Sequence, residues 1–266
     1  MPVCITGMHR SGTSLMANLM GRCGLYLGEE DDLLPASPDN TDGYWENRKF
    51  VSLNDEILLE LGSAWDCPTQ ASEGWPHEER FNSIRFKAEI LLEQFVDREP
   101  WGWKDPRTSL TLPFWQSLDG ITMPFWLGRR GKLKIVLCLR DPLEVFESLR
   151  DRRFTPSLSG LDLWLTYNQR ILDTVLPEDR IVTHYDAYFE NAGDELRRVL
   201  DFVGLQVSSE VIAASLRIVS GSLRHKRSSI ASLRAANISP EVIDLYMALC
   251  EEANYSQPLD SYSFAP

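Results

Sequence analysis

The chain has 266 residues, of which 43% are hydrophobic and 25% are charged, and its formal net charge is −12. This composition is ordinary for a globular protein and argues against a disordered or fibrous chain. Nucleic acids and anionic membranes attract positive charge, so the net charge argues against both as partners. No apolar run approaches the ~18 residues of a membrane span, and no basic and apolar leader precedes the first expected strand. We therefore expect a cytoplasmic protein.

The charges are unevenly distributed along the chain. Residues 29–66 are strongly acidic, with only Arg48 and Lys49 as basic residues, whereas residues 217–234 contain basic residues and no acidic one. An acidic protein that keeps basic islands is expected to use them for a small anion. The five cysteines are scattered, which favours small buried hydrophobes over disulfides or a metal site.

A strand, a glycine-containing loop and a helix are predicted at the start of the chain. Residues 3–6 are apolar and partly β-branched, Gly7 and Gly12 fall in the following loop, and Leu15, Met16 and Leu19 then recur at helical spacing. Such a loop directs backbone N–H groups to one spot beside the positive end of the helix dipole. The pattern predicts a phosphate-binding loop; a βα turn without a ligand is the alternative.

This loop differs from the P-loop of nucleotide-hydrolysing proteins, which has the form G-x-x-x-x-G-K-[ST]. Gly7 and Gly12 keep the spacing, but Thr13 stands in place of the lysine and Arg10 lies within the loop. The usual lysine holds the β- and γ-phosphates of a triphosphate near magnesium. Its absence favours a ligand with fewer phosphates and no metal.

The rest of the chain alternates predicted strands and helices. A polar loop over residues 28–47 leads into helices near 48–61 and 78–96; strands follow at 101–105, 134–139 and 180–185. Further helices are expected at 143–151, 161–175, 193–203, 208–218 and 240–253. We expect an α/β fold of the P-loop type, with a doubly wound, mainly parallel central sheet flanked by helices on both faces. Residues 1–266 are expected to form a single domain, with a loop and helical insertion over approximately 28–98.

In such a sheet, ligands bind beyond the carboxyl ends of the strands. Residues directly after the predicted strands therefore matter most, and besides the loop at 7–14 they include Lys104, Arg140 and Tyr185. Ser148 follows Arg140 by eight residues, about two turns into the next expected helix. Solvated charges at strand ends are the alternative for each group.

The loop His9-Arg10-Ser11-Gly12-Thr13-Ser14 and the pair Arg140 and Ser148 resemble the two nucleotide-binding motifs of sulfotransferases. These enzymes use 3′-phosphoadenosine 5′-phosphosulfate (PAPS) as the sulfuryl donor and release 3′-phosphoadenosine 5′-phosphate (PAP). The resemblance implies that the 5′-phosphosulfate lies on Arg10, Ser11, Gly12, Thr13 and Ser14, with His9 touching the sulfate or fixing the loop. It also implies that Arg140 and Ser148 bind the 3′-phosphate.

Two further segments are placed like nucleotide-binding segments of that family. Tyr185-Asp186 resembles a pair whose tyrosine lies beside the nucleotide. The basic residues Arg224, Lys226 and Arg227 stand where the family has a C-terminal phosphate clamp, although the arginine-lysine-glycine pattern of the hormone and phenol enzymes is absent. A solvated basic face is the alternative for this last segment.

Sulfuryl transfer requires in-line positioning, cations around the transferring group and a base for the acceptor hydroxyl. Lys104, in a Lys-Asp-Pro sequence that resembles one in tyrosylprotein sulfotransferases, is the best lysine for this role, and Arg10 would share the charge. Phenol sulfotransferases have a histidine base after the corresponding strand, where this chain has Asp105. Glu46 is therefore the candidate base, because bacterial and tyrosylprotein-type relatives place a glutamate in this region; a surface glutamate is the alternative.

The acceptor is expected to be the hydroxyl of a small molecule, sugar or lipid-like compound. Five tryptophans between residues 45 and 103 suit such a ligand or the core. The acidic segment argues against a polyanionic glycan as acceptor and allows a neutral or cationic one. A P-loop small-molecule kinase and a non-catalytic nucleotide-binding protein remain alternatives. Against the kinase, Asp105 and Asp141 each lie between a basic residue and a proline, which suits an ion pair or helix cap better than a magnesium ligand.

Overall fold

A parallel sheet forms the centre of the protein. The computed structural model describes residues 2–37, 40, 43–118, 133–151, 159–221 and 228–256. Within them, four strands pair in the order β2-β1-β3-β4, all parallel. The strands are β1 (Val3–Thr6), β2 (Gly102–Lys104), β3 (Lys134–Leu139) and β4 (Arg180–His184). The predicted α/β class and its parallel sheet are confirmed.

The strand register brings the predicted ligand-binding segments to one edge of the sheet. Ile5 of β1 is paired with Lys104 of β2, and Leu139 of β3 is paired with His184 of β4. The next residues along the chain are the glycine loop, Asp105, Arg140 and Tyr185. All four carboxyl ends therefore meet at the edge where ligands bind in open α/β sheets.

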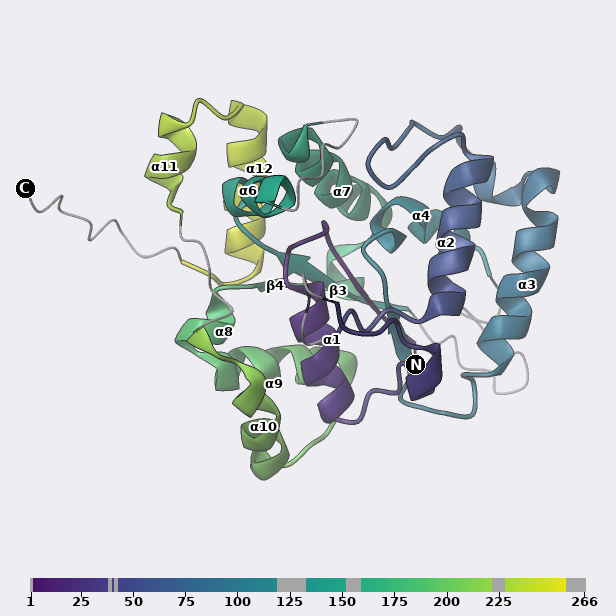
Figure 1. The fold of residues 1–266 in the computed structure, drawn as a ribbon, viewed down its shortest axis with the longest axis horizontal. Coiled ribbons are helices and arrows are strands. Elements are labelled where there is room, and N and C mark those ends of the chain that lie inside the picture. Colours follow the sequence, from purple (N-terminus) through teal and green to yellow (C-terminus); the bar gives the residue numbers. More distant parts are fainter. Residues whose placement is uncertain are drawn as a thin grey trace, which may run out of the picture.

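Helices cover both faces of the sheet (Figure 1). Along β3, Ile135 and Leu137 contribute to one apolar core and Val136 and Cys138 to the other, as expected for a strand buried on both sides. The first core is covered by α2 (Arg48–Glu60), α3 (Asn82–Glu93), α4 (Thr108–Gln116), α6 (Pro142–Asp151), α7 (Gly160–Thr174), α11 (Ile230–Ala235) and α12 (Pro240–Glu252). The second is covered by α1 (Thr13–Arg22), α8 (Ala187–Glu190), α9 (Ala192–Val203) and α10 (Ser209–Ser215).

Among the residues that the structure describes, three helices were not predicted from the sequence. Helices α8 and α11 are short, with bounds Ala187–Glu190 and Ile230–Ala235. Helix α4 contains Pro113 and buries nearly all its side chains, so its sequence shows no apolar stripe that alternates with polar residues. The helix expected over 78–96 is shorter, because residues 79–81 form a 3-10 turn and α3 ends at Glu93.

None of the helices in the described ranges combines the length and the apolar character that a bilayer crossing requires.

Candidate functional site

The glycine loop packs against the ends of β3 and β4. Gly7 has φ of 138°, and a Cβ placed on it would lie 2.4 Å from the carbonyl oxygen of Cys138. Gly12 has φ of 88°, and a Cβ there would lie 2.4 Å from Cδ2 of Tyr185. Both positions combine left-handed backbone with a close approach that only glycine permits. The two glycines thus hold the loop against the sheet edge.

The loop ends at an uncapped helix N-terminus and carries a buried hydroxyl. Arg10 has φ of 73°, and the Ser11 amide donates back to the Met8 carbonyl over 3.1 Å, which closes a tight turn. Gly12 precedes the first residue of α1, and no side chain caps that helix. The Ser11 hydroxyl is buried and has no hydrogen-bond partner among the described residues. An uncapped helix N-terminus beside an unpartnered hydroxyl is suited to a phosphate.

A buried ion pair lies beside this loop. Lys104, at the end of β2, has an Nζ 2.7 Å from Oε1 of Glu46, and the two side chains are only 2% and 8% exposed. The same ammonium group donates to the Tyr44 carbonyl over 3.0 Å and to Ser14 Oγ over 3.3 Å. The structure therefore brings the predicted lysine, the predicted base and a residue of the phosphate loop together at one point.

The segment that carries Glu46 is held in place by its neighbours. The Glu46 carbonyl accepts a hydrogen bond from the Leu34 amide over 2.8 Å, and the Asn47 side chain caps α2 by accepting from the Lys49 amide over 3.0 Å. Trp45 has φ of 62°. Glu46 therefore enters the site from a fixed turn at the start of a helix, and its side chain is buried instead of lying on the acidic surface.

A second basic group lies near the ends of β3 and β4. The Arg10 Nε donates to Ser148 Oγ over 2.9 Å, and Arg140 Nη1 donates to the Arg10 carbonyl over 3.2 Å. The guanidinium carbon of Arg140 lies 4.5 Å from the centre of the Tyr185 ring, a cation–π contact. Four residues that the sequence predicted for the site therefore lie together: Arg10, Arg140, Ser148 and Tyr185. Ser148 is hydrogen-bonded to Arg10, and Arg10 in turn accepts a hydrogen bond from Arg140.

Glu144 was not predicted and belongs to this group. Its Oε2 accepts from Arg140 Nε over 2.9 Å, its Oε1 accepts from the Ser228 amide over 3.0 Å, and the residue is 1% exposed. Burial raises the pKa of Glu144 to about 7; the Arg140 guanidinium opposes this shift, and the negative charge of Asp186 adds to it. An acidic residue four positions after the strand-end arginine was the available sequence signal.

The two strand-end aspartates stabilise local structure. Asp105 Oδ1 accepts from the backbone amide of Arg107 over 2.9 Å and from its Nη1 over 3.1 Å. Asp141 Oδ1 accepts from the amides of Leu143 and Glu144 over 2.9 and 3.2 Å, at the start of α6. These are the ion-pair and capping roles expected from the sequence.

Aromatic side chains divide between the site and the core. The His9 ring lies 4.6 Å from the Trp65 ring and 5.9 Å from the Tyr167 ring, between ring centres. The Tyr167 hydroxyl donates to the Trp65 carbonyl over 2.8 Å, which fixes this segment over the phosphate loop. Trp101 and Trp103 are 2% and 0% exposed and belong to the core. Trp65 instead lies beside His9 of the glycine loop.

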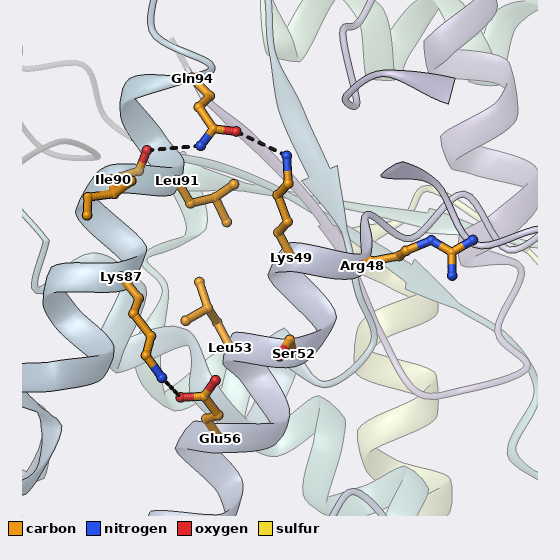
Figure 2. A pocket seen from close by; sticks show the side chains of 9 residues that line it. All are labelled: Arg48, Lys49, Ser52, Leu53, Glu56, Lys87, Ile90, Leu91 and Gln94. Carbon is orange, nitrogen blue, oxygen red and sulfur yellow. Dashed lines mark hydrogen bonds and ion pairs between the residues drawn. The ribbon is translucent and has the colours of Figure 1, made fainter. Parts of the chain in front are cut away.

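A surface groove of about 340 Å³ lies between α2 and α3 (Figure 2). Two polar contacts span it: Lys49 Nζ to Gln94 Oε1 at 3.1 Å, and Lys87 Nζ to Glu56 Oε2 at 2.6 Å. None of the residues that the sequence predicted for the site lines this groove. It is therefore separate from the group around Lys104.

The predicted clamp residues Arg224, Lys226 and Arg227 lie outside the described residues.

Comparisons with known proteins give the fold a counterpart. No protein-family model matches the sequence, and a search of curated proteins finds no match. The structure is similar to the sulfotransferase domain of the olefin synthase of Synechococcus PCC 7002, with a TM-score of 0.53 and 18% identity over 97% of this chain and 96% of that domain. It is also similar to the sulfotransferase domain of the curacin biosynthetic pathway, with a TM-score of 0.51 and 16% identity over 96% and 98%. The fold is thus that of sulfotransferase domains.

Proposed function

We propose that the protein is a PAPS-dependent sulfotransferase that moves a sulfuryl group to an acceptor hydroxyl. The observation that carries the proposal is the buried contact of Lys104 with both Glu46 and Ser14 of the phosphate loop, at the carboxyl edge of the sheet. The Lys104 ammonium and the Glu46 carboxylate are thus in contact beside the loop that would bind the phosphate. The sulfotransferase-like fold supports the same conclusion.

The donor would bind across two phosphate subsites. The backbone amides of residues 12–14, at the uncapped start of α1, and the Ser11 hydroxyl would bind the 5′-phosphosulfate. Arg140 and Ser148 would bind the 3′-phosphate, with Tyr185 beside the nucleotide. Arg10 lies between the two subsites through its contacts with both residues of the second. Arg224, Lys226 and Arg227 stay proposed as further phosphate ligands.

Catalysis would divide between Lys104 and Glu46. The acceptor oxygen attacks the sulfur atom, the bond between sulfur and the bridging phosphate oxygen breaks, and PAP leaves. Glu46 would accept the hydroxyl proton, while Lys104 would stabilise the negative charge that develops on the bridging oxygen. Their 2.7 Å contact keeps both groups within reach of one reacting centre. In-line positioning and these charges suffice without a metal ion.

The acceptor would approach from the side of the segment near residues 28–98, which carries Glu46 and Trp65. The Trp65 ring beside His9 offers an apolar face for a sugar or lipid-like alcohol. The acidic residues of the same segment argue against a polyanionic acceptor and allow a neutral or cationic one. We also propose that the catalytic unit is a single domain and that the enzyme is cytoplasmic.

Donor binding is tested by thermal stabilisation with PAP, compared with ATP and magnesium. A specific ligand at 100 times its dissociation constant stabilises the folded state by about 2.7 kcal/mol. We expect PAP to raise the melting temperature and ATP with magnesium to have little effect. The opposite pattern would favour a P-loop kinase.

Transfer is tested by incubating the enzyme and PAPS with an extract and searching by mass spectrometry for products that gain a sulfuryl group. With an acceptor found in this way, Glu46→Gln should lower kcat by ~10²–10⁴ while PAP affinity is kept. The matched control is Glu56→Gln, which alters a glutamate–lysine pair on the surface of α2. PAP binding without transfer to any acceptor would support a non-catalytic nucleotide-binding protein.

A further inference from the structure

The guanidinium group of Arg140 is constrained from three directions. Its Nε donates to Glu144 over 2.9 Å, its Nη1 donates to the Arg10 carbonyl over 3.2 Å, and its flat face lies 4.5 Å from the Tyr185 ring centre. The side chain is 8% exposed. No described residue contacts Nη2 by a hydrogen bond, so this donor is available to a ligand. The direction of Nη2 depends on the group that holds Nε, which is Glu144.

Glu144 also holds a second segment. Its other carboxylate oxygen accepts from the Ser228 backbone amide over 3.0 Å. The Ser228 hydroxyl is buried and, in the part of the chain that the structure describes, has no hydrogen-bond partner. A buried hydroxyl without a partner is unfavourable unless a ligand satisfies it. One carboxylate therefore connects a strand-end arginine with an unused hydroxyl.

We propose that Glu144 is a positioning residue that orients Arg140 and Ser228 around the 3′-phosphate of the nucleotide. This inference rests on the proposed function, because it assigns the second phosphate to Arg140. Glu144 does not bind the phosphate itself, since its two oxygens are occupied by Arg140 and Ser228. It acts through them by fixing the Nε side of the guanidinium and leaving its outer N–H groups for the anion.

The ion pair suits this role because guanidinium and phosphate must meet in a defined geometry. A planar guanidinium binds an oxyanion best through parallel N–H groups, and a freely rotating arginine loses conformational entropy when it does so. Glu144 is buried in the first turn of α6, four residues after Arg140, so the pair is ordered before the ligand arrives. If the Glu144 carboxylate instead repelled the phosphate, removing it would strengthen nucleotide binding.

The experiment compares PAP with AMP, which lacks the 3′-phosphate, by titration calorimetry on the full chain. Glu144→Gln and Glu144→Ala should weaken PAP binding by about 10–100-fold, the effect of losing one hydrogen bond to a charged group. AMP affinity should stay within about twofold, because the first phosphate subsite is untouched. A merely structural role would lower the affinity for both nucleotides together.

Glu252→Gln is the matched control. Glu252 forms a two-point ion pair with Arg180, at 2.7 and 2.8 Å, at the opposite end of β4 from the site. This variant should alter neither affinity. Ser228→Ala provides a second test that keeps the ion pair, since the hydroxyl that it removes has no partner. It should weaken PAP binding several-fold and leave AMP binding unchanged.

The outcomes separate this inference from the proposed function. A wild-type protein that does not prefer PAP to AMP would overturn both. A wild-type preference for PAP that survives in the Glu144 and Ser228 variants would overturn the positioning role alone. Tighter PAP binding after loss of the carboxylate would also overturn it, because Glu144 would then compete with the phosphate. Selective loss of PAP affinity supports the inference.

Discussion

Replacing Lys104 by methionine tests the buried ion pair on which the proposed chemistry depends. Methionine approximates the length of the side chain but leaves the Glu46 carboxylate buried without its cation. The Tyr44 carbonyl and Ser14 hydroxyl also lose a donor, at present 3.0 and 3.3 Å away. Removing one partner of a buried pair costs about 3–5 kcal/mol of unfolding free energy. For a protein of this size, the melting temperature should fall by roughly 10 °C.

The pairing itself is measured by a double-mutant cycle. Glu46→Gln alone should cost about 1–3 kcal/mol, because Lys104 keeps its contacts with Tyr44 and Ser14. In the double variant neither charge is left unpaired, so its loss should be smaller than the sum of the single losses by about 1–3 kcal/mol. Lys87→Met, which removes the cation of a half-exposed pair with Glu56, should cost less than about 1 kcal/mol.

Urea unfolding followed by tryptophan fluorescence measures all four variants, since the chain has 8 tryptophans. Additive losses in the cycle would refute the reasoning, because they would mean that the two side chains do not interact. A loss below about 1 kcal/mol for Lys104→Met would refute it too, because it would place Lys104 in a solvated environment.

Three further predictions concern the loop, a titrating carboxyl and a buried amide. Gly12→Ala should lower PAP affinity at least about tenfold in calorimetry, because the added methyl carbon meets Tyr185 at a left-handed backbone position. The pKa of Glu144 is about 7 in the folded protein, above the ordinary value of 4.5, so the folded state binds the proton more tightly than the unfolded state. The stability that this protonation contributes is complete below pH 4.5 and is lost as the pH rises through 7. Urea titrations of the wild type and Glu144→Gln measure this effect as the difference between their unfolding free energies. Wild type minus variant should decrease by up to about 3 kcal/mol between pH 4.5 and 8, and a constant difference would contradict the prediction. Asn54→Leu should destabilise the protein by about 2–4 kcal/mol in urea unfolding, because Asn54 Nδ2 donates to the buried Asp105 carboxylate over 2.8 Å.

Much of the fold was predictable because its local patterns are strong. Residues 134–139 are continuously apolar, and they form β3 within those bounds. The expected helix at 48–61 forms as α2, with Asn47 as its cap. Helix α4 was missed because burial on nearly all sides removes the periodic signal on which such predictions depend. The alternation of apolar and polar residues in a helix reflects which sides are buried, and a helix that is buried on all sides shows no such alternation.

The site was predictable at the level of strand ends but not of individual contacts. The parallel register accounts for the meeting of Lys104 and the glycine loop, since both follow neighbouring strands. The contact of Arg10 with Ser148 depends on the left-handed backbone of Arg10, which the sequence does not specify. A site role for Glu144 was not predicted, because an acidic residue in the first turn of a helix is already explained by its favourable interaction with the helix dipole. Its second contact, with Ser228, spans 84 positions of the chain.

The buried contact between Lys104 and Glu46 has a consequence for the order of events. The Glu46 carboxylate and the Lys104 ammonium neutralise each other's charge across their 2.7 Å contact. Under the proposed mechanism, an arriving donor competes with Glu46 for Lys104 and thereby frees the carboxylate. The protein would become competent to deprotonate an acceptor only after the donor is bound, which gives an ordered reaction with the nucleotide first.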